Sequence, residues 1–443
     1  MAGIAGIAEK GAKKKVRKML GKISYRGKAG ITVFESEGTT LGMVWNDNEY
    51  VTSGKHIARR SVGYENGPGH CAKVRSKAGK LIMYRDELGV APLYYGRDDS
   101  GNMCFSSEVK SLLSVTNEIS EMPAGHISDG EDLECHYTLK TENHSDDNPE
   151  RIADDLRKHL DNAVSACLTS DDIGSWLSGG LDSSAICALA SEKVKKLKTF
   201  TAGLREAPDI ISAREMARYI RSDHHEIIVT KDDMISVLPE VIYHLESFDA
   251  LLVRSAITNY FVARLASDHV SGVFSGEGGD ELFAGYDYLK KIPRIQLENE
   301  LEKITGQLHN TALQRVDRCA SAHGTTVYTI FTNPEIVNFA FTIPVRYKLY
   351  NNVEKWILRK ALEGLLPKHI AKRPKAKFWE GAGTRELISD YTEKMITDSD
   401  FKRERYLAND LIINTKEELY YYRLFKEHFG SDIDISWMGR TSI

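Results

Sequence analysis

The sequence predicts two domains, a β-rich N-terminal α+β domain and a C-terminal α/β domain built on a parallel sheet with a helical extension. Three observations support this prediction. Short β-type runs, punctuated by Gly, Asn and Asp, fill residues 1 to about 138. Apolar runs then alternate with helical patterns, which is typical of a parallel α/β sheet. From about residue 285 the 443-residue chain shows mainly helical patterns.

The N-terminal region contains three clear strand patterns, at 30–34, 41–45 and 80–84. A basic run at 10–18 continues into apolar residues at helical spacing, which favours a surface helix over a targeting or nucleic-acid segment. The polar stretch 141–149 has almost no apolar content and is the best linker candidate. We therefore predict domains at 1–140 and 150–443.

The C-terminal region begins with an amphipathic helix and continues with four strand patterns. The helix would bury one face, formed by Ile152, Leu156, Leu160, Ala163 and Ala166. The strands are predicted at 173–177, 198–202, 225–229 and 270–274. Their spacing leaves room for a helix between consecutive strands, so the sheet is expected to be parallel.

Composition excludes several classes of protein. The hydrophobic content of 42% and charged content of 28% are ordinary for a globular protein. A net charge of −4 gives no support for a nucleic-acid binder. Six scattered cysteines indicate reduced thiols, and neither a membrane span nor a signal peptide is visible. We expect a cytoplasmic protein without membrane or nucleic-acid partners.

The most informative segment is Ser-Gly-Gly-Leu-Asp-Ser-Ser at 178–184, between a predicted strand and a predicted helix. Such a turn offers free backbone N–H groups to a polyphosphate, while hydroxyls donate and a carboxylate holds a divalent cation. The pattern resembles the loop of ATP-pyrophosphatases, which cleave ATP between the α and β phosphates. The candidate ATP-binding residues are Ser178, Gly179, Gly180, Asp182, Ser183 and Ser184. The alternative is a Gly-Gly turn capped by Asp and Ser at a helix start.

A second segment with the same pattern lies at 273–281, where small residues follow a predicted strand. It carries the acidic residues Glu277, Asp280 and Glu281. Ligands of open α/β sheets bind beyond the carboxyl ends of strands, so both loops are expected to face one site. Asp182 and Asp280 could then share Mg²⁺ on the phosphates, with Glu277 nearer the reacting carbonyl. The alternative is a glycine-rich turn with a helix-capping acid.

Together these segments resemble the asparagine synthetase family. The supporting runs are 178–184, 275–286, Arg315-Val-Asp-Arg318, 354–367 and 373–383. The resemblance implies an ATP-pyrophosphatase domain with ATP and Mg²⁺ as cofactors, an Ntn-hydrolase-like N-terminal sandwich and a homodimer. It places adenine near Leu177, Ala202, Ser275 and Gly276. It also makes Glu277 and Lys375 catalytic and puts Arg254 near the substrate or pyrophosphate.

The N-terminal region departs from that family at its nucleophile. The runs 3–7, 84–89, 92–95 and 105–108 resemble a class II glutamine amidotransferase, whose cysteine follows the initiator methionine. Here position 2 is Ala2, and a methyl group cannot attack an amide. An engineered replacement would give the same residue, but the family's RGPD has also become Arg-Gly-Lys-Ala at 26–29 and its glutamine-binding segment has no counterpart. We therefore expect a retained scaffold without glutaminase activity.

The acceptor segment also departs from the family. Leu251 and Leu252 stand where asparagine synthetases carry hydroxyl residues, which weakens the prediction of aspartate as substrate. β-Lactam synthetases are relatives without the cysteine, but Phe331 stands where they carry a catalytic tyrosine. The resemblance thus implies an AMP-forming amide ligase that joins a small carboxylate to ammonia or an amine. A ligase for another amide or lactam, and a nucleotide-binding pseudoenzyme, remain alternatives.

Overall fold

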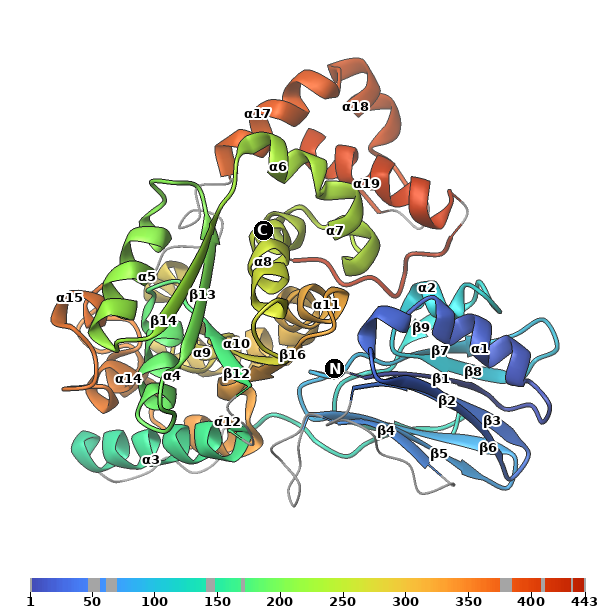
Figure 1. Ribbon diagram of the computed structural model, residues 1–443, viewed down its shortest axis with the longest axis horizontal. Helices are drawn as coiled ribbons and strands as arrows, with labels where there is room; N and C mark the ends of the chain where they lie inside the picture. The colour runs from blue at the N-terminus through green and yellow to red at the C-terminus, as the bar shows by residue number, and fades with distance from the viewer. Residues whose placement is uncertain are drawn as a thin grey trace.

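The computed structural model describes residues 2–46, 56–60, 70–140, 148–168, 172–374, 385–407, 411–431 and 433–441, with the backbone alone at 56–60 and 385–386. Two stacked antiparallel sheets form the N-terminal part, and a parallel sheet flanked by helices forms the C-terminal part (Figure 1). The predicted fold class is confirmed, while the boundaries 1–140 and 150–443 stay a prediction. Among the described residues, no helix combines the length and apolar composition needed to cross a membrane.

The N-terminal sheets enclose an apolar core between them. The first sheet has the order β2 (Gly30–Ser36), β3 (Thr39–Trp45), β1 (Gly3–Ile7), β8 (Met103–Ser106), β7 (Tyr94–Arg97) and β9 (Ile119–Glu121). The second has the order β11 (Leu133–Cys135), β10 (His126–Ser128), β6 (Lys80–Arg85), β5 (Cys71–Lys77) and β4 (His56–Arg60). Their facing side chains include Ile4, Leu41, Val74 and Met83. The strand predictions at 30–34, 41–45 and 80–84 are confirmed.

Strand β1 shows how alternation distributes side chains to two cores. Ile4 packs in the core of the sandwich, whereas Ala5 and Ile7 join the main hydrophobic cluster with residues of α1 (Lys13–Gly21). Helix α1 buries Val16, Met19 and Leu20 and leaves its other side to solvent, as predicted for the basic run. The short segments η1 (Ser24–Arg26) and α2 (Val109–Leu112) complete this part.

The C-terminal sheet is parallel throughout its described strands. Its order is β14 (Asp223–Ile228), β13 (Lys198–Gly203), β12 (Ile173–Trp176), β15 (Gly272–Ser275) and β16 (Thr326–Thr329). The four predicted strands are confirmed, whereas β16 was missed because its four residues lack a long apolar run. The chain proceeds from β12 outward to β14 and then returns to β15 on the other side of β12. The switch in strand order therefore lies between β12 and β15.

Helices cover both faces of this sheet. Helices α4 (Leu181–Ser191) and α5 (Pro208–Tyr219) lie on one face, and α8 (Ala250–Ser267) and α11 (Gln314–Ala322) lie on the other (Figure 1). Helix α3 (Pro149–Cys167) packs against α4. Its predicted face is correct for Ile152, Leu156, Leu160 and Ala163 but wrong for Ala166, which is exposed. Val164 and Cys167 are buried instead, because the buried stripe drifts around the helix.

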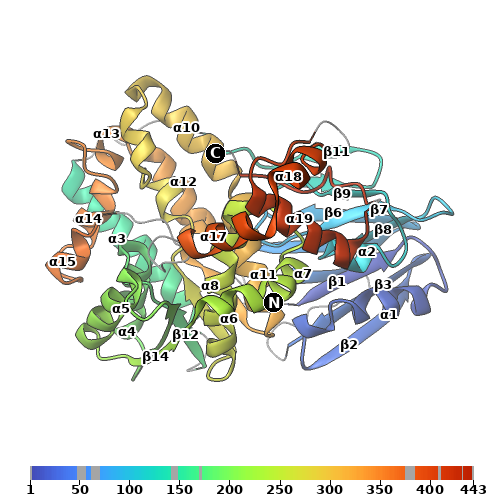
Figure 2. The same ribbon diagram turned by 90° about the horizontal axis from the view of Figure 1, so that it is seen from above.

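The remaining segments surround this core. Those in the middle of the chain are α6 (Lys231–Ser236), α7 (Leu238–Leu245), α9 (Gly279–Leu282), η2 (Asp287–Lys291), α10 (Arg294–Gly306) and the π-helical η3 (His309–Leu313). Later ones are η4 (Ile330–Thr332), α12 (Pro334–Thr342), α13 (Val345–Lys348), α14 (Trp356–Ala361) and α15 (Lys368–Ala371). The extension α17 (Arg385–Met395), α18 (Asp398–Glu404) and α19 (Lys416–Phe429) packs on α6 and α7 (Figure 2).

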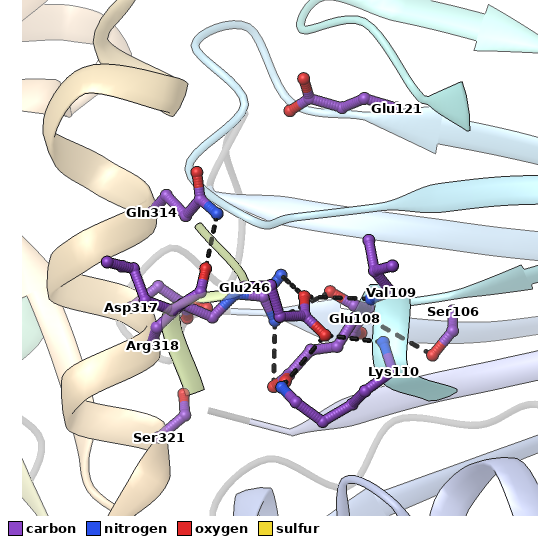
Figure 3. A network of polar contacts seen from close by, with 12 residues as sticks. Ser106, Glu108, Val109, Lys110, Glu121, Glu246, Gln314, Asp317, Arg318 and Ser321 are labelled. Carbon is purple, nitrogen blue, oxygen red and sulfur yellow. Dashed lines mark hydrogen bonds and ion pairs between the residues drawn. The ribbon is translucent and has the colours of Figure 1, made fainter. Parts of the chain in front are cut away.

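A buried cluster of charged side chains joins the two parts. We call Arg26, Glu108, Lys110, Glu246, Asp317 and Arg318 the interface cluster (Figure 3). Arg318 donates to Glu246 Oε2 at 2.8 Å and approaches Glu108 Oε1 at 3.0 Å. Arg26 pairs with Glu108 and with Asp317 Oδ2 at 2.8 Å, and Lys110 also pairs with Glu108. The cations and carboxylates of the cluster are equal in number.

Glu246 is held in an unusual backbone conformation by this cluster. It lies at the end of α7 with a φ of 56°, in the left-handed region that a side chain disfavours. Its carboxylate accepts hydrogen bonds from the backbone N–H of Lys110 at 2.7 Å and of Val109 at 3.0 Å. The start of α2 is thus capped by a residue of the C-terminal part, which ties the two parts together (Figure 3).

Candidate active site

The two predicted loops lie side by side at the switch in strand order. The loop 178–180 follows β12 and leads into α4, and the loop 276–278 follows β15 and leads into α9. Gly276 requires the absence of a side chain, because a Cβ there would lie 2.7 Å from the Ser183 backbone nitrogen. At Gly279 a Cβ would lie 2.8 Å from Asp182 Cγ. The glycines therefore let the second loop reach the start of α4, the position where α/β sheets bind ligands.

The first loop is shaped by glycine and serine. Gly179 has a φ of 68°, and a Cβ there would lie 2.4 Å from the backbone carbon of Ser212 in α5. The hydroxyls of Ser178 and Ser183 lie 3.0 Å apart, and Ser183 Oγ also accepts from the Ser178 N–H at 3.2 Å. In the described residues no side chain caps α4 at Gly180, so its first N–H groups face the loop.

Lys355 lies between the two predicted metal carboxylates. Its Nζ is 2.6 Å from Asp280 Oδ1 and forms a second ion pair with Asp182. Lys355 is 2% exposed, and its backbone, with a φ of 55°, donates to Phe283 O at 3.1 Å. A Cβ on Gly285 would lie 2.3 Å from Lys355 Cε. We call Asp182, Asp280 and Lys355 the cavity cluster. No local pattern in the sequence distinguishes Lys355 from the neighbouring lysines.

Glu277 is oriented by an arginine from α11. Arg315 forms an ion pair with Glu277 and a hydrogen bond to Asn259 of α8. The side chain of Glu277 keeps 27% of its exposure, so this carboxylate remains accessible beside the second loop. Helix α11 therefore presents Arg315 to the loop and Arg318 to the interface cluster. Sequence reasoning had assigned no role to Arg315.

Glu281 is buried next to Asp280 at the cavity, where its pKa is raised toward neutrality. Burial, together with the negative charge of Asp280, raises the pKa of Glu281 to about 7. Tyr286 Oη donates to Glu281 at 2.5 Å, and burial raises the pKa of Tyr286 as well. The acidic side of the loop thus carries less negative charge than its composition suggests.

Arg254 lies near the start of α8 and is bound by a carboxylate of the helical extension. Its Nε donates to Glu417 Oε1 at 2.6 Å, and its Nη2 pairs with Glu417 Oε2. Tyr421 Oη donates to the same Glu417 at 2.8 Å. Leu251 lies one turn earlier and faces the same space, whereas Leu252 is buried.

These residues surround a cavity of about 1010 Å³. The predicted residues that line it are Leu177, Ser178, Gly180, Asp182, Ser183, Ala202, Arg254, Ser275, Gly276, Glu277 and Asp280. Gly179 and Ser184 are not in its lining: Gly179 packs on α5, and Ser184 is fully buried one position further around α4. Phe331 and Tyr328 are also buried, and neither belongs to the described lining.

The segment that carries the predicted lysine approaches the first loop. Arg373 donates to Ser178 O at 3.1 Å and to Asp209 Oδ1 at 2.7 Å, and Pro374 lines the cavity. Lys375 lies outside the described residues. At the opposite end, Thr441 donates its backbone N–H to Asp249 Oδ2 at 2.9 Å, where Asp249 caps α8. Residues near the end of the described chain therefore form one wall of the cavity.

A divalent cation would fit the cavity cluster. The carboxylates of Asp182 and Asp280 already converge on a single positive charge, the ammonium of Lys355. Among the described residues, no group of three or more His, Cys, Asp or Glu side chains could hold a metal ion. Two carboxylates that share an ion with substrate phosphates are the usual arrangement for Mg²⁺.

Comparisons with known proteins identify the family of this chain. The asparagine synthase family model matches residues 155–304 and 296–421, and the model of the glutamine amidotransferase domain matches residues 71–135. Asparagine synthetase [glutamine-hydrolyzing] 2 of Arabidopsis thaliana is 32% identical over 374 residues, which are 79% of this chain and 65% of the relative. Asparagine synthetase [glutamine-hydrolyzing] of Mus musculus is 30% identical over 400 residues, or 80% of this chain and 71% of the relative.

The chain thus spans less than two thirds of the Arabidopsis relative's length. Among solved structures, an NMN synthetase from Francisella tularensis has 12% identity and a TM-score of 0.31, covering 64% of this chain and 97% of that one. This structural likeness is too weak to support an argument. The two family models and the curated relatives instead establish the relationship: the chain belongs to the asparagine synthase family.

Proposed function

We propose that this protein is an ATP-dependent, AMP-forming amide ligase. A carboxylate oxygen of the substrate attacks the α-phosphorus of ATP, and pyrophosphate leaves. The nitrogen of ammonia or an amine then attacks the acyl carbon, and AMP leaves. The observation that carries this proposal is the cavity cluster, which lies where two glycine loops meet at the switch in strand order.

The phosphates are proposed to bind at the start of α4. The first backbone N–H groups of α4 and the hydroxyl of Ser183 would face them, and Leu177 and Ala202 provide an apolar surface for the adenine. Asp182 and Asp280 would hold Mg²⁺, which supplies positive charge to the phosphate oxygens. Lys355 adds a fixed ammonium beside the same carboxylates, where it neutralises charge on the leaving pyrophosphate.

The second half of the reaction is assigned to the other loop. Glu277 accepts the proton that the attacking amine loses, and Arg315 fixes the position of its carboxylate. Lys375 is proposed to neutralise the tetrahedral intermediate by family likeness alone. Arg254, which was predicted to lie near the substrate, is proposed to shape the acceptor side of the cavity.

We further propose that the N-terminal part does not hydrolyse glutamine. Ala2 is fully buried in the core of the sandwich, in a cluster with Ile4, Leu41 and Met43. A methyl group in an apolar core supplies neither a nucleophile nor access for a polar substrate. Ammonia or an amine would therefore come from solution or from another protein. The six cysteines are scattered along the chain without a paired spacing, which favours a reducing compartment, and we place the protein in the cytoplasm.

Release of AMP and pyrophosphate tests the proposal. The protein is incubated with ATP, Mg²⁺, ammonium and a panel of carboxylic acids, and each nucleotide product is separated and counted. AMP should form in proportion to amide and only when an acid is present. Release of ADP instead of AMP, or tight ATP binding without turnover of any acid, would reject the ligase and favour a nucleotide-binding pseudoenzyme.

A further inference from the structure

The acceptor side of the cavity holds a positive charge that the protein itself neutralises. Both carboxylate oxygens of Glu417 contact the guanidinium of Arg254, with Nε at 2.6 Å from Oε1. The two side chains are 13% and 3% exposed, and Tyr421 adds a hydrogen bond to Glu417. Such a forked, buried pair satisfies the face of the arginine that a ligand carboxylate would otherwise use.

The other cations of the described lining are also paired with acids. These pairs are Lys303 with Glu300, Arg315 with Glu277, Lys355 with Asp182 and Asp280, Arg359 with Glu354, Arg373 with Asp209, and Arg440 with Glu418. At the cavity cluster a divalent ion and ATP would change this balance. At the Arg254 end, next to Leu251, nothing in the proposed reaction changes the pairing of cations with acids.

A second carboxylate on the acid substrate would therefore meet Glu417 instead of a free cation. To bind Arg254, it would have to displace Glu417, and the displaced carboxylate would remain buried without a charged partner. An acid whose only carboxylate is the reacting one avoids this penalty. Its remaining portion would instead lie against Leu251 and the neighbouring N–H and hydroxyl groups.

We infer that the acceptor site takes monocarboxylic acids and excludes dicarboxylic ones such as aspartate, and that Glu417 determines this selectivity. The inference rests on the proposed ligase function and specifies its substrate class. Glu417 acts through Arg254, so it is a specificity-determining residue and takes no part in the chemistry. Its removal should free Arg254 and admit the second carboxylate.

Matched pairs of acids test this selectivity in the unmodified protein. β-Alanine is aspartate without its α-carboxylate, 4-aminobutyrate is glutamate without it, and 3-phenylpropionate lacks one carboxylate of phenylsuccinate. Acid-dependent exchange of labelled pyrophosphate into ATP reports adenylation of each acid. The monocarboxylate of a pair should give a kcat/KM about tenfold or more above its partner. Equal or better use of the dicarboxylates in every active pair would overturn the inference.

The Glu417→Gln variant tests the assigned residue. Gln keeps the shape of the side chain and leaves Arg254 with a net positive charge, so the preference within each pair should shift toward the dicarboxylate by about tenfold. The matched control is Glu404→Gln. Glu404 forms another forked pair with an arginine of α19, in which Arg423 Nε lies 3.0 Å from Glu404 Oε2. This pair lies outside the described lining of the cavity. The control should leave the preference unchanged.

The possible failures can be told apart. If no acid of either class supports exchange, the ligase proposal fails and this inference fails with it. If monocarboxylates are preferred but Glu417→Gln, shown to be folded by its melting transition, keeps the same preference, Glu417 is not the determinant. The comparison in the unmodified protein does not depend on the folding of any variant.

Discussion

The interface cluster and the cavity cluster are both buried groups of charges, but only one of them lines a cavity. In the interface cluster, Arg26 and Arg318 meet Glu108 and Glu246 in ion pairs whose partners all belong to the protein. In the cavity cluster, two carboxylates share the single ammonium of Lys355 beside a cavity of about 1010 Å³. The first group lies between the two parts of the chain, whereas the second faces a space that a ligand can enter.

This difference separates a structural role from a chemical one. Desolvated charges are costly unless they are fully paired, so the balanced interface cluster fits a permanent contact between the two parts of the chain. Carboxylates that line a cavity can instead exchange their partners, which fits a site where a bound cation takes part in the reaction. Variants of the two clusters should therefore affect different properties.

The largest effect is expected from Asp182→Asn in the cavity cluster. Loss of this carboxylate removes a proposed Mg²⁺ ligand and should lower AMP release by about a thousandfold or more. Its free energy of unfolding should not fall, because one acid remains for Lys355. The control Asp287→Asn removes an exposed acid that pairs with Lys290 and should preserve activity. Turnover by Asp182→Asn near the wild-type rate would falsify the assignment.

The next effect is expected from Arg318→Met in the interface cluster. This change leaves the buried carboxylates of Glu108 and Glu246 without one cation, and should lower the free energy of unfolding by about 3–5 kcal/mol. Denaturant titration measures it. Lys158→Met, which breaks the exposed pair with Asp155, should cost less than about 0.5 kcal/mol. Equal losses in the two variants would remove the distinction between buried and exposed pairs.

Acid should destabilise the folded protein through His244, which lies beside the interface cluster. Burial and the charge of Lys110 lower the pKa of His244 from 6.5 to about 3, and His244 contacts Tyr25 with ring centroids 4.6 Å apart. The unfolded chain binds this proton below pH 6.5 while the folded protein does not, so stability falls as the pH drops from about 6.5 toward 3.

The His244→Gln variant isolates that contribution. Between pH 7 and pH 4 it should lose about 3 kcal/mol less unfolding free energy than the wild type. Glu108 is present in the wild type and in the His244→Gln variant. Arg26, Arg318 and Lys110 hold its pKa well below the usual range against the effect of burial. The stability that each protein loses when Glu108 is protonated therefore cancels in the comparison. Parallel pH profiles of the two proteins would show that His244 titrates normally.

The smallest effect is expected from Ala2→Cys. A thiol at this buried position adds one sulfur atom to the core of the sandwich without opening access to glutamine. Glutamate release from glutamine should stay at background, and AMP formation with ammonium should be unchanged. Glutamine hydrolysis by this variant would mean that the N-terminal part retains a substrate pocket, and that its role is not limited to the interface cluster.

The sequence predicted the parts of the site that lie within single loops. Strand, glycine turn and helix start are local patterns, so Ser178, Asp182, Gly276 and Asp280 were found and line the cavity. The motif predicted less reliably which way each side chain points. Each helical residue turns the side chain by about 100°, so Ser184 faces the core although Ser183 faces the cavity.

Contacts between distant segments could not be predicted. Lys355 reaches Asp182 from 173 positions away, and Arg254 meets Glu417 from 163 positions away. Neither lysine nor glutamate has a local pattern that marks such a role, and only the packing of α14 and α19 brings them there. The interface cluster was missed for the same reason, because each of its residues looks like a solvated charge in the sequence.

Helix α11 contacts both the N-terminal part and the second loop of the cavity. One side of the helix carries Asp317 and Arg318 into contact with Arg26 and Glu108, and another carries Arg315 to Glu277. A gene that lost its first 140 codons would leave Arg318 without its Glu108 partner, on the helix that aligns Glu277. A change in the N-terminal part can therefore reach Glu277 through α11, because the helix that positions Arg315 also packs on the interface cluster.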